Sequence, residues 1–427
     1  MRVSTGRAFA SAVRMLSTVP VPPLPSPAVD RSALFARKFR GVNGALAGRD
    51  GLLAYTIADM DLQAPKPIVD AVTAVAASGI YGYTDPSDQL TDDLLTRLTN
   101  VYGCAEPRAE WLRWQPGLLP GLNHAVRATC RAGEADAVAI ATPIYPPFLA
   151  APVNNDARRL LVPLRAEVAD GGALRHELDL GALEDALALP STRLLMWCQP
   201  HNPSGRCWSA EEMAEVARLC VQHDVVLLSD EVWGEMPLEP EAVPFVSALS
   251  LLDDVEGLRD KLIVLTSPSK CFNIATTNIA TAIIPNASLR RRFAACGRDA
   301  AEVTPFGYAA AAAAYGDAEC EAWRQRMVAY IKANRDYAAA VLRECPGVTT
   351  TMPEASYLLW IDATAALPAD APSAESFFLD EANVWLSAGE SFGAEGGGYV
   401  RMNLACSRET LAAGLERMRA ALGRAQK

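Results

Sequence analysis

Lys270 has the clearest potential for chemistry, because a lysine amine can form a Schiff base with an aldehyde cofactor and can later take a proton from a substrate. Ser267 and Ser269 precede it, and their hydroxyls can donate hydrogen bonds to a phosphate group. A lysine in a loop is more often a solvated surface charge. Residues 267–270 therefore predict a cofactor site only if other segments supply the remaining partners.

Asp230, Asn202 and Tyr145 could hold the ring of such a cofactor. Asp230 follows an apolar stretch, where an unpaired carboxylate is costly and a protonated pyridine nitrogen would pair with it; helix capping is the alternative role. The Asn202 amide could donate to a ring oxygen, although turn formation explains its N-P-S-G sequence equally well. Tyr145 could stack on a flat ring or pack in the core.

Two further segments could bind anionic groups. Gly117 and Leu118 precede a predicted helix, and the N–H groups at a helix start bind phosphate. Arg401 lies in an otherwise apolar stretch, where its guanidinium requires a carboxylate, either of a ligand or of a structural salt bridge.

An alternation of strands and helices predicts how these residues meet. Between residues 60 and 300, short apolar stretches alternate with helical patterns, which indicates a parallel sheet with helices on its faces. The expected strands are 137–141, 193–198, 225–228, 262–265 and 279–284, and the expected helices include 119–131 and 210–222. Polar loops follow the first four strands, so we expect residues 142–147, 199–205, 229–231 and 266–270 to meet at the carboxyl edge of the sheet.

The C-terminal part has a different pattern, typical of a second, α+β domain. An alanine-rich helical stretch at 308–342 precedes strand-like segments at 357–362 and 399–404, with helices near 374–381 and from 407. The expected organisation is a disordered tail or transit peptide at 1–30, an N-terminal segment of the small domain at 31–80, a large domain at 81–305 and a small α+β domain at 306–427.

Composition argues against several classes of protein. The net charge of −11 disfavours binding to nucleic acid, and no uncharged stretch is a convincing membrane span. Ten scattered cysteines without metal-ligand spacing fit free thiols in a reducing compartment, and we expect no metal. Arginine, serine and threonine without acids before Asp30 fit either a mitochondrial or plastid transit peptide or the tail of a cytoplasmic protein.

Taken together, the segments resemble the aminotransferases of fold type I, which depend on pyridoxal 5′-phosphate (PLP). The nearest likeness is to the branch of cystathionine β-lyases called the MalY/PatB group. The matching segments are 57–61 (I-A-D-M-D), 81–84 (Y-G-Y-T), 116–122 (P-G-L-L-P-G-L), 200–206 (P-H-N-P-S-G-R), 229–231 (S-D-E), 269–275 (S-K-C-F-N-I-A) and 400–406 (V-R-M-N-L-A-C). The resemblance implies an α/β fold with a mostly parallel, seven-stranded type of sheet in the large domain and a smaller α+β domain.

The resemblance also implies a role for each candidate residue. Lys270, Asp230 and Tyr81 would be catalytic. Contacts to PLP would come from Lys270, Asp230, Asn202, Tyr145, Gly117, Leu118, Ser267 and Trp233. Substrate contacts would come from Arg401, Tyr81 and Asp59, with Tyr81 reaching the phosphate of a second subunit in a homodimer that shares its active sites.

Two positions depart from the pattern of the family. Trp233 stands where relatives usually have Tyr or His, and Asn278 stands where many have Arg or Lys on the phosphate. The implied activity is β-elimination from cystathionine or a cysteine S-conjugate, giving thiol, pyruvate and ammonia. The alternatives are an aminotransferase of a small amino acid, which shares the early steps, and a non-catalytic or regulatory protein of the same fold.

Overall fold

The computed structural model describes residues 21–31, 36–41, 44–169 and 171–425. The tail or transit peptide predicted at the N-terminus falls largely on residues 1–20, outside this part. The chain joins the folded body before residue 30, because Val29 N–H donates to the Asp61 carbonyl at 2.8 Å and Ala28 forms a β-bridge with Leu62.

A seven-stranded sheet forms the centre of the larger part of the molecule, in the order β2-β10-β9-β8-β7-β3-β4. Its strands are β2 (Leu112–Gln115), β3 (Ala137–Thr142), β4 (Arg158–Pro163), β7 (Thr192–Cys198), β8 (Val226–Asp230), β9 (Leu262–Thr266) and β10 (Ala280–Ile283). In this sheet β4 and β3, β3 and β7, β7 and β8, and β8 and β9 are parallel neighbours. The predicted α/β class with a mostly parallel sheet is confirmed.

One strand accounts for the sheet being mostly, and not wholly, parallel. β10, which falls on the strand expected at 279–284, pairs antiparallel with both β9 and β2. All four residues of β10 are buried. A strand that is buried on both faces is apolar throughout in either direction, so its composition does not reveal which way it runs.

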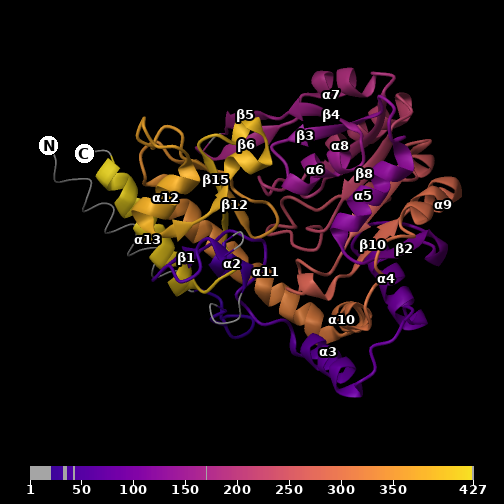
Figure 1. The fold of residues 1–427 in the computed structure, drawn as a ribbon, viewed down its shortest axis with the longest axis horizontal. Helices are drawn as coiled ribbons and strands as arrows, with labels where there is room; N and C mark the ends of the chain where they lie inside the picture. The colour runs from indigo at the N-terminus through magenta and orange to yellow at the C-terminus, as the bar shows by residue number, and fades with distance from the viewer. Residues whose placement is uncertain (1–20, 32–35, 42–43, 170, 426–427) are drawn as a thin grey trace.

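Helices cover both faces of the sheet (Figure 1). On one face, α5 (Leu118–Thr129), α6 (Pro146–Asn154) and α9 (Ala287–Cys296) pack against side chains such as Ile140 and Leu228. On the other face, α4 (Asp88–Asn100), α7 (Leu180–Leu187) and α8 (Ala210–Gln222) pack against the alternate side chains, such as Leu195 and Leu227. A capping box begins α8, with the Ser209 and Glu212 side chains accepting hydrogen bonds from each other's backbone N–H groups.

The smaller part is built on a four-stranded antiparallel sheet, in the order β11-β12-β15-β14. Its strands are β11 (Thr349–Thr350), β12 (Leu358–Asp362), β14 (Ser387–Ala388) and β15 (Tyr399–Asn403), with helices α12 (Ala374–Ala382) and α13 (Arg408–Ala425) beside them. Tyr55, from the N-terminal segment, packs into the same apolar core. A two-stranded pair, β1 (Leu53–Ala54) with β13 (Val384–Trp385), ties that segment to this part.

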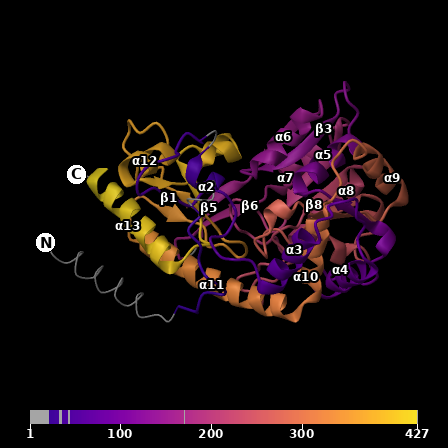
Figure 2. The ribbon, with the colours of Figure 1, turned by 60° about the horizontal axis from the view of Figure 1, so that its bottom comes forward.

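The alanine-rich stretch that was predicted to be helical forms two helices. α10 (Pro305–Gly316) ends at Asp317, whose extended backbone (φ −98°, ψ 126°) and side chain cap the start of α11 (Ala318–Arg343). α10 packs against α3 (Lys66–Ser78) and α4, whereas α11 runs on toward α13 (Figure 2).

The domain boundaries at residues 80 and 305 stay predictions.

Candidate functional site

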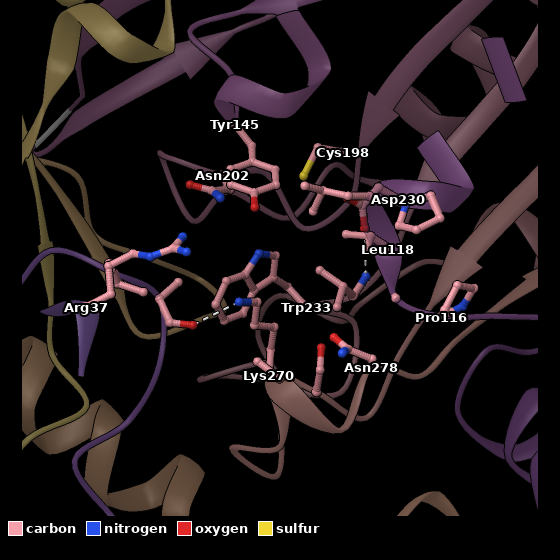
Figure 3. Close-up of a pocket in the computed structure, with 18 of the residues that line it drawn as sticks. Arg37, Pro116, Leu118, Tyr145, Cys198, Asn202, Asp230, Trp233, Lys270 and Asn278 are labelled. Carbon is pink, nitrogen blue, oxygen red and sulfur yellow. Dashed lines mark hydrogen bonds between the residues drawn. The ribbon is translucent and has the colours of Figure 1, made fainter. Parts of the chain in front are cut away.

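The carboxyl ends of β7, β8 and β9 open into a cavity of about 480 Å³, close to the smaller part of the molecule. Figure 3 shows its lining side chains directed toward a common centre. The residues predicted from the sequence that line it are Gly117, Leu118, Tyr145, Asn202, Asp230, Trp233, Lys270 and Arg401. Segments widely separated in the sequence are thus brought together at the predicted edge.

Lys270 reaches the cavity from a tight turn that follows β9. Ser269 N–H donates to the Ser267 hydroxyl at 3.1 Å, and Phe272 N–H donates to the Pro268 carbonyl at 3.0 Å. The Lys270 amine donates to the carbonyl of Ala58 at 2.8 Å. Burial, and then the positive charge of Arg401, lower the pKa of Lys270 from 10.5 to about 8. At pH 7 roughly a tenth of the amine is therefore neutral, and hence nucleophilic, far more than for an ordinary lysine.

Asp230 ends β8 with only 1% of its surface exposed. Val232 N–H donates to its Oδ1 at 3.1 Å. Burial raises the pKa of Asp230 from 3.8 to about 7, against the opposing effects of that hydrogen bond and of Lys270. A protonated pyridine nitrogen in the cavity would compensate the buried carboxylate, so this residue fits the ring of PLP.

Arg401 and Asn202 form a buried pair on another wall. Arg401 Nη1 donates to Asn202 Oδ1 at 3.0 Å, and its Nη2 donates to the Ser387 hydroxyl at 3.3 Å. Burial lowers the pKa of Arg401 from 12.5 to about 10. Within the described part of the chain, no carboxylate lies at ion-pair distance from Arg401, and its Nε has no hydrogen-bond acceptor. This donor set fits an incoming carboxylate.

The start of α5 forms a third wall. Gly117 precedes the helix with φ at +113°, a conformation that favours glycine, and Leu118 is the first helical residue. The N–H groups of the first helical turn have no partner within the helix and so suit an anion. Asn278 lies on this side of the cavity, near Leu118 and Pro116 (Figure 3).

Comparison with known proteins decides the family. The model of the family described as aminotransferase class I and II matches residues 65–418. This chain belongs to that family. The cystathionine beta-lyase PatB of Bacillus subtilis is 34% identical over 383 residues, which cover 89% of this chain and 95% of that protein. The protein MalY of Escherichia coli is 29% identical, covering 91% and 96% of the two chains.

A solved structure is similar to this member of the aminotransferase family over nearly its full length. Cystalysin from Treponema denticola, whose structure contains a pyridoxal 5′-phosphate cofactor, matches with a TM-score of 0.84 and 25% identity. The match covers 95% of this chain and 100% of cystalysin. The resemblance stated from the motifs, to fold type I and to the MalY/PatB branch, is confirmed.

Three predicted site residues lie outside the cavity of this aminotransferase-family chain. Ser267 is buried, and its hydroxyl donates to the Ile279 carbonyl at 2.6 Å; Ser269 lines the cavity instead. Asp59 accepts a hydrogen bond from Arg31 at 2.8 Å. Tyr81 is 60% exposed, and its hydroxyl donates to the Ala76 carbonyl at 2.8 Å. Their predicted roles stay predictions.

Sequence reasoning missed several residues of the wall, among them Arg37 and Ala58, which supply polar groups. Arg37 belongs to α2 (Arg37–Arg40), which is too short to show a helical period. Ala58 contributes its backbone carbonyl, which also accepts a hydrogen bond from the Tyr357 hydroxyl at 3.0 Å. A main-chain contact of this kind is independent of the side chain. The only available signal was the position of Ala58 within the segment 57–61.

No described helix has the length and hydrophobicity that crossing a membrane requires. Over the same residues, no group of three or more His, Cys, Asp or Glu side chains is arranged to hold a metal ion.

Proposed function

We propose that the protein is a PLP-dependent carbon–sulfur β-lyase that acts on cystathionine or cysteine S-conjugates. The observation that carries this proposal is one cavity that unites a lysine of lowered pKa, a buried carboxylate and a buried arginine without an acidic partner. The names of the relatives support the substrate class, since PatB is called a cystathionine beta-lyase.

The residues present fit the cofactor part by part. Lys270 would hold the aldehyde carbon, Asp230 would face the ring nitrogen, and Asn202 and Tyr145 would contact the ring. The backbone N–H groups at Leu118 and the hydroxyl of Ser269 would receive the phosphate. When bound, PLP supplies an electron sink that stabilises negative charge on the α-carbon of an amino acid.

The reaction uses the remaining groups of the chain as follows. Arg401 binds the α-carboxylate and so orients the α-carbon. The neutral amine of Lys270 takes the α-proton, since its pKa of about 8 suits a general base near neutral pH. The bond between Cβ and sulfur breaks, the sulfur leaves as a thiol, and water completes the products. One S-conjugate and one water give one thiol, one pyruvate and one ammonium ion.

Turnover of defined substrates tests the proposal. The purified protein with PLP should release thiol and pyruvate in equal amounts from L-cystathionine or S-methyl-L-cysteine, and borohydride should fix the cofactor to the chain. Lys270→Ala should lower kcat by at least about 10³-fold, because the proton transfer loses its base, and should prevent the fixation. Formation of the aminated cofactor and a keto acid, without thiol, would contradict the lyase and indicate an aminotransferase.

We also infer that two copies associate and share their sites. Ile80, Tyr81 and Tyr83 are large apolar or aromatic side chains with exposed fractions of 77%, 60% and 94% in the single chain. Exposed groups of this kind mark contact surfaces. The predicted role of Tyr81 at a neighbouring phosphate depends on this association. Sedimentation of the wild-type protein and of Tyr83→Ser tests it, since the variant should shift the equilibrium toward the monomer.

A further inference from the structure

Arg37 is a cation of the cavity wall that the proposed reaction does not use. Its side chain lines the cavity and is also exposed to solvent, so it lies at the mouth. Among the described residues, none forms a hydrogen bond or an ion pair with its guanidinium at the distances that define these contacts. Arg37 therefore has its hydrogen-bonding capacity available for a ligand.

The neighbours of Arg37 attach its helix firmly beside the cavity. The side chain of Lys38 is fully buried and donates to Asp61 Oδ2 at 2.8 Å. Arg31, which precedes α2 in the sequence, donates to Asp59 Oδ2 at 2.8 Å and to the Met60 carbonyl at 2.7 Å. Asp59 and Asp61 lie just after Ala58, whose carbonyl accepts a hydrogen bond from the Lys270 amine. These contacts fix the backbone of α2 relative to the lysine.

Neither the cofactor phosphate nor the α-carboxylate accounts for Arg37. Figure 3 places Arg37 on the side of the cavity opposite Pro116, Leu118 and Asn278, the side predicted to hold the phosphate. Arg37 thus does not replace the Arg or Lys that many relatives have at the position of Asn278. The α-carboxylate already has a buried partner in Arg401.

The charges around the cavity show what remains unmatched. The acidic and basic side chains of the wall are Arg37, Lys270, Arg401 and Asp230. Asp230 would pair with the ring nitrogen and Arg401 with the α-carboxylate, and Lys270 would bind the cofactor. The positive charge at the mouth is left without a partner.

We propose that Arg37 selects cysteine S-conjugates whose sulfur substituent ends in a carboxylate. This inference rests on the proposed lyase function and narrows its substrate class. With the α-carboxylate at Arg401, a sulfur substituent that extends toward the mouth would reach Arg37. A guanidinium forms two parallel hydrogen bonds with a carboxylate, which a neutral group of the same shape does not reproduce.

A matched pair of substrates tests the selection. S-(2-carboxyethyl)-L-cysteine and its amide, S-(2-carbamoylethyl)-L-cysteine, have the same length and shape and differ in charge. The wild-type enzyme should prefer the acid in kcat/KM by roughly tenfold, an effect expected of one charged hydrogen-bonding contact near solvent. Arg37→Gln should reduce the ratio to about one, mainly by raising KM for the acid, and should leave the amide within about twofold of the wild type.

Arg40→Gln is the matched control, because Arg40 belongs to the same helix but does not line the cavity. It should keep the preference for the acid. A preference that survives in Arg37→Gln, or that is lost equally in Arg40→Gln, overturns the role of Arg37. Equal turnover of both conjugates by the wild type overturns this inference and leaves the lyase function intact. Failure of both conjugates, and of S-methyl-L-cysteine, to release pyruvate counts against the proposed function itself.

Discussion

Asp230 shows at the scale of one residue how a binding site lowers the stability of the free protein. Its folded pKa of about 7 lies above the ordinary aspartate value of 3.8, so the folded state binds this proton more tightly than the unfolded state. The contribution to the free energy of unfolding is therefore fully present below pH 3.8 and is lost as the pH rises through 7. Above pH 7 the cofactor-free protein has a buried charge that PLP would neutralise.

Asp230→Asn should therefore stabilise the cofactor-free protein at pH 8 and should have a much smaller effect on its stability at pH 4.5. Asparagine stays uncharged throughout, so the expected gain at pH 8 is about 2–4 kcal/mol. Urea unfolding of both cofactor-free proteins at the two pH values measures this gain. The same variant should bind PLP more weakly, because the ring nitrogen loses its partner. An equal effect at both pH values would show that charge is not the cause.

The sequence predicted that Lys270, Asp230, Asn202 and Arg401 would lie in one site, because each has a polar group beside an apolar stretch. It did not predict the choice between Ser267 and Ser269. Both hydroxyls lie near the lysine in sequence, and the turn directs one to the Ile279 carbonyl and the other to the cavity. Such a choice depends on backbone dihedral angles that composition does not specify.

At the scale of elements, α2 depends on a buried ion pair. Lys38 and Asp61 have side chains 0% and 12% exposed, and burial raises the pKa of Asp61 even though Lys38 and Arg31 oppose the rise. Lys38→Met should leave that carboxyl group without its main partner and cost roughly 3 kcal/mol of unfolding free energy. Because α2 carries Arg37, KM for acidic conjugates should also rise.

Lys66→Met provides the control for this prediction. Lys66 contacts Asp70 at 2.6 Å, but these side chains are 81% and 59% exposed, so the loss should stay near 0.5 kcal/mol. Denaturant unfolding of the two variants, alongside kinetics with acidic conjugates, makes the comparison. Equal losses in the two variants would contradict the importance assigned to Lys38.

The elements themselves were partly predictable. The buried strands β3, β7, β8 and β9 stood out as apolar stretches between turn residues. The sheet-edge strands β2 and β4 did not, because several of their side chains are partly or fully exposed and form no apolar stretch. The break between α10 and α11 could have been read at Asp317, since aspartate favours the position before a helix.

At the scale of the whole molecule, Gly205 is a contact point between the two parts. Its carbonyl accepts hydrogen bonds from Glu354 N–H and Ala355 N–H, at 2.9 and 3.0 Å, in the segment before β12. Its φ is +72°, and an added Cβ would lie 2.6 Å from the Cβ of Pro353. The same turn contains Asn202, which bonds Arg401 of the smaller part. The site thus depends on how the two parts meet.

Gly205→Ala should therefore cost about 2–4 kcal/mol of unfolding free energy, through both the strained φ and the clash with Pro353. It should also weaken substrate binding, because Asn202 and Arg401 would lose their alignment. Gly133→Ala is the control, since Gly133 has a φ of +76° but open space around it, and about 1 kcal/mol is expected. Thermal unfolding with steady-state kinetics distinguishes the two; similar costs would exclude the clash.

The carbonyl of Ala58 has a consequence for how the lysine is released. It accepts both the Lys270 amine, at 2.8 Å, and the Tyr357 hydroxyl, at 3.0 Å. A carbonyl oxygen has two lone pairs, and each of these donors can occupy one. When the amine turns toward an arriving aldehyde, the tyrosine stays, so no buried acceptor is left unsatisfied and the swing of the lysine avoids that penalty. The free amine is therefore held by a hydrogen bond whose loss leaves the Ala58 oxygen still bonded to Tyr357.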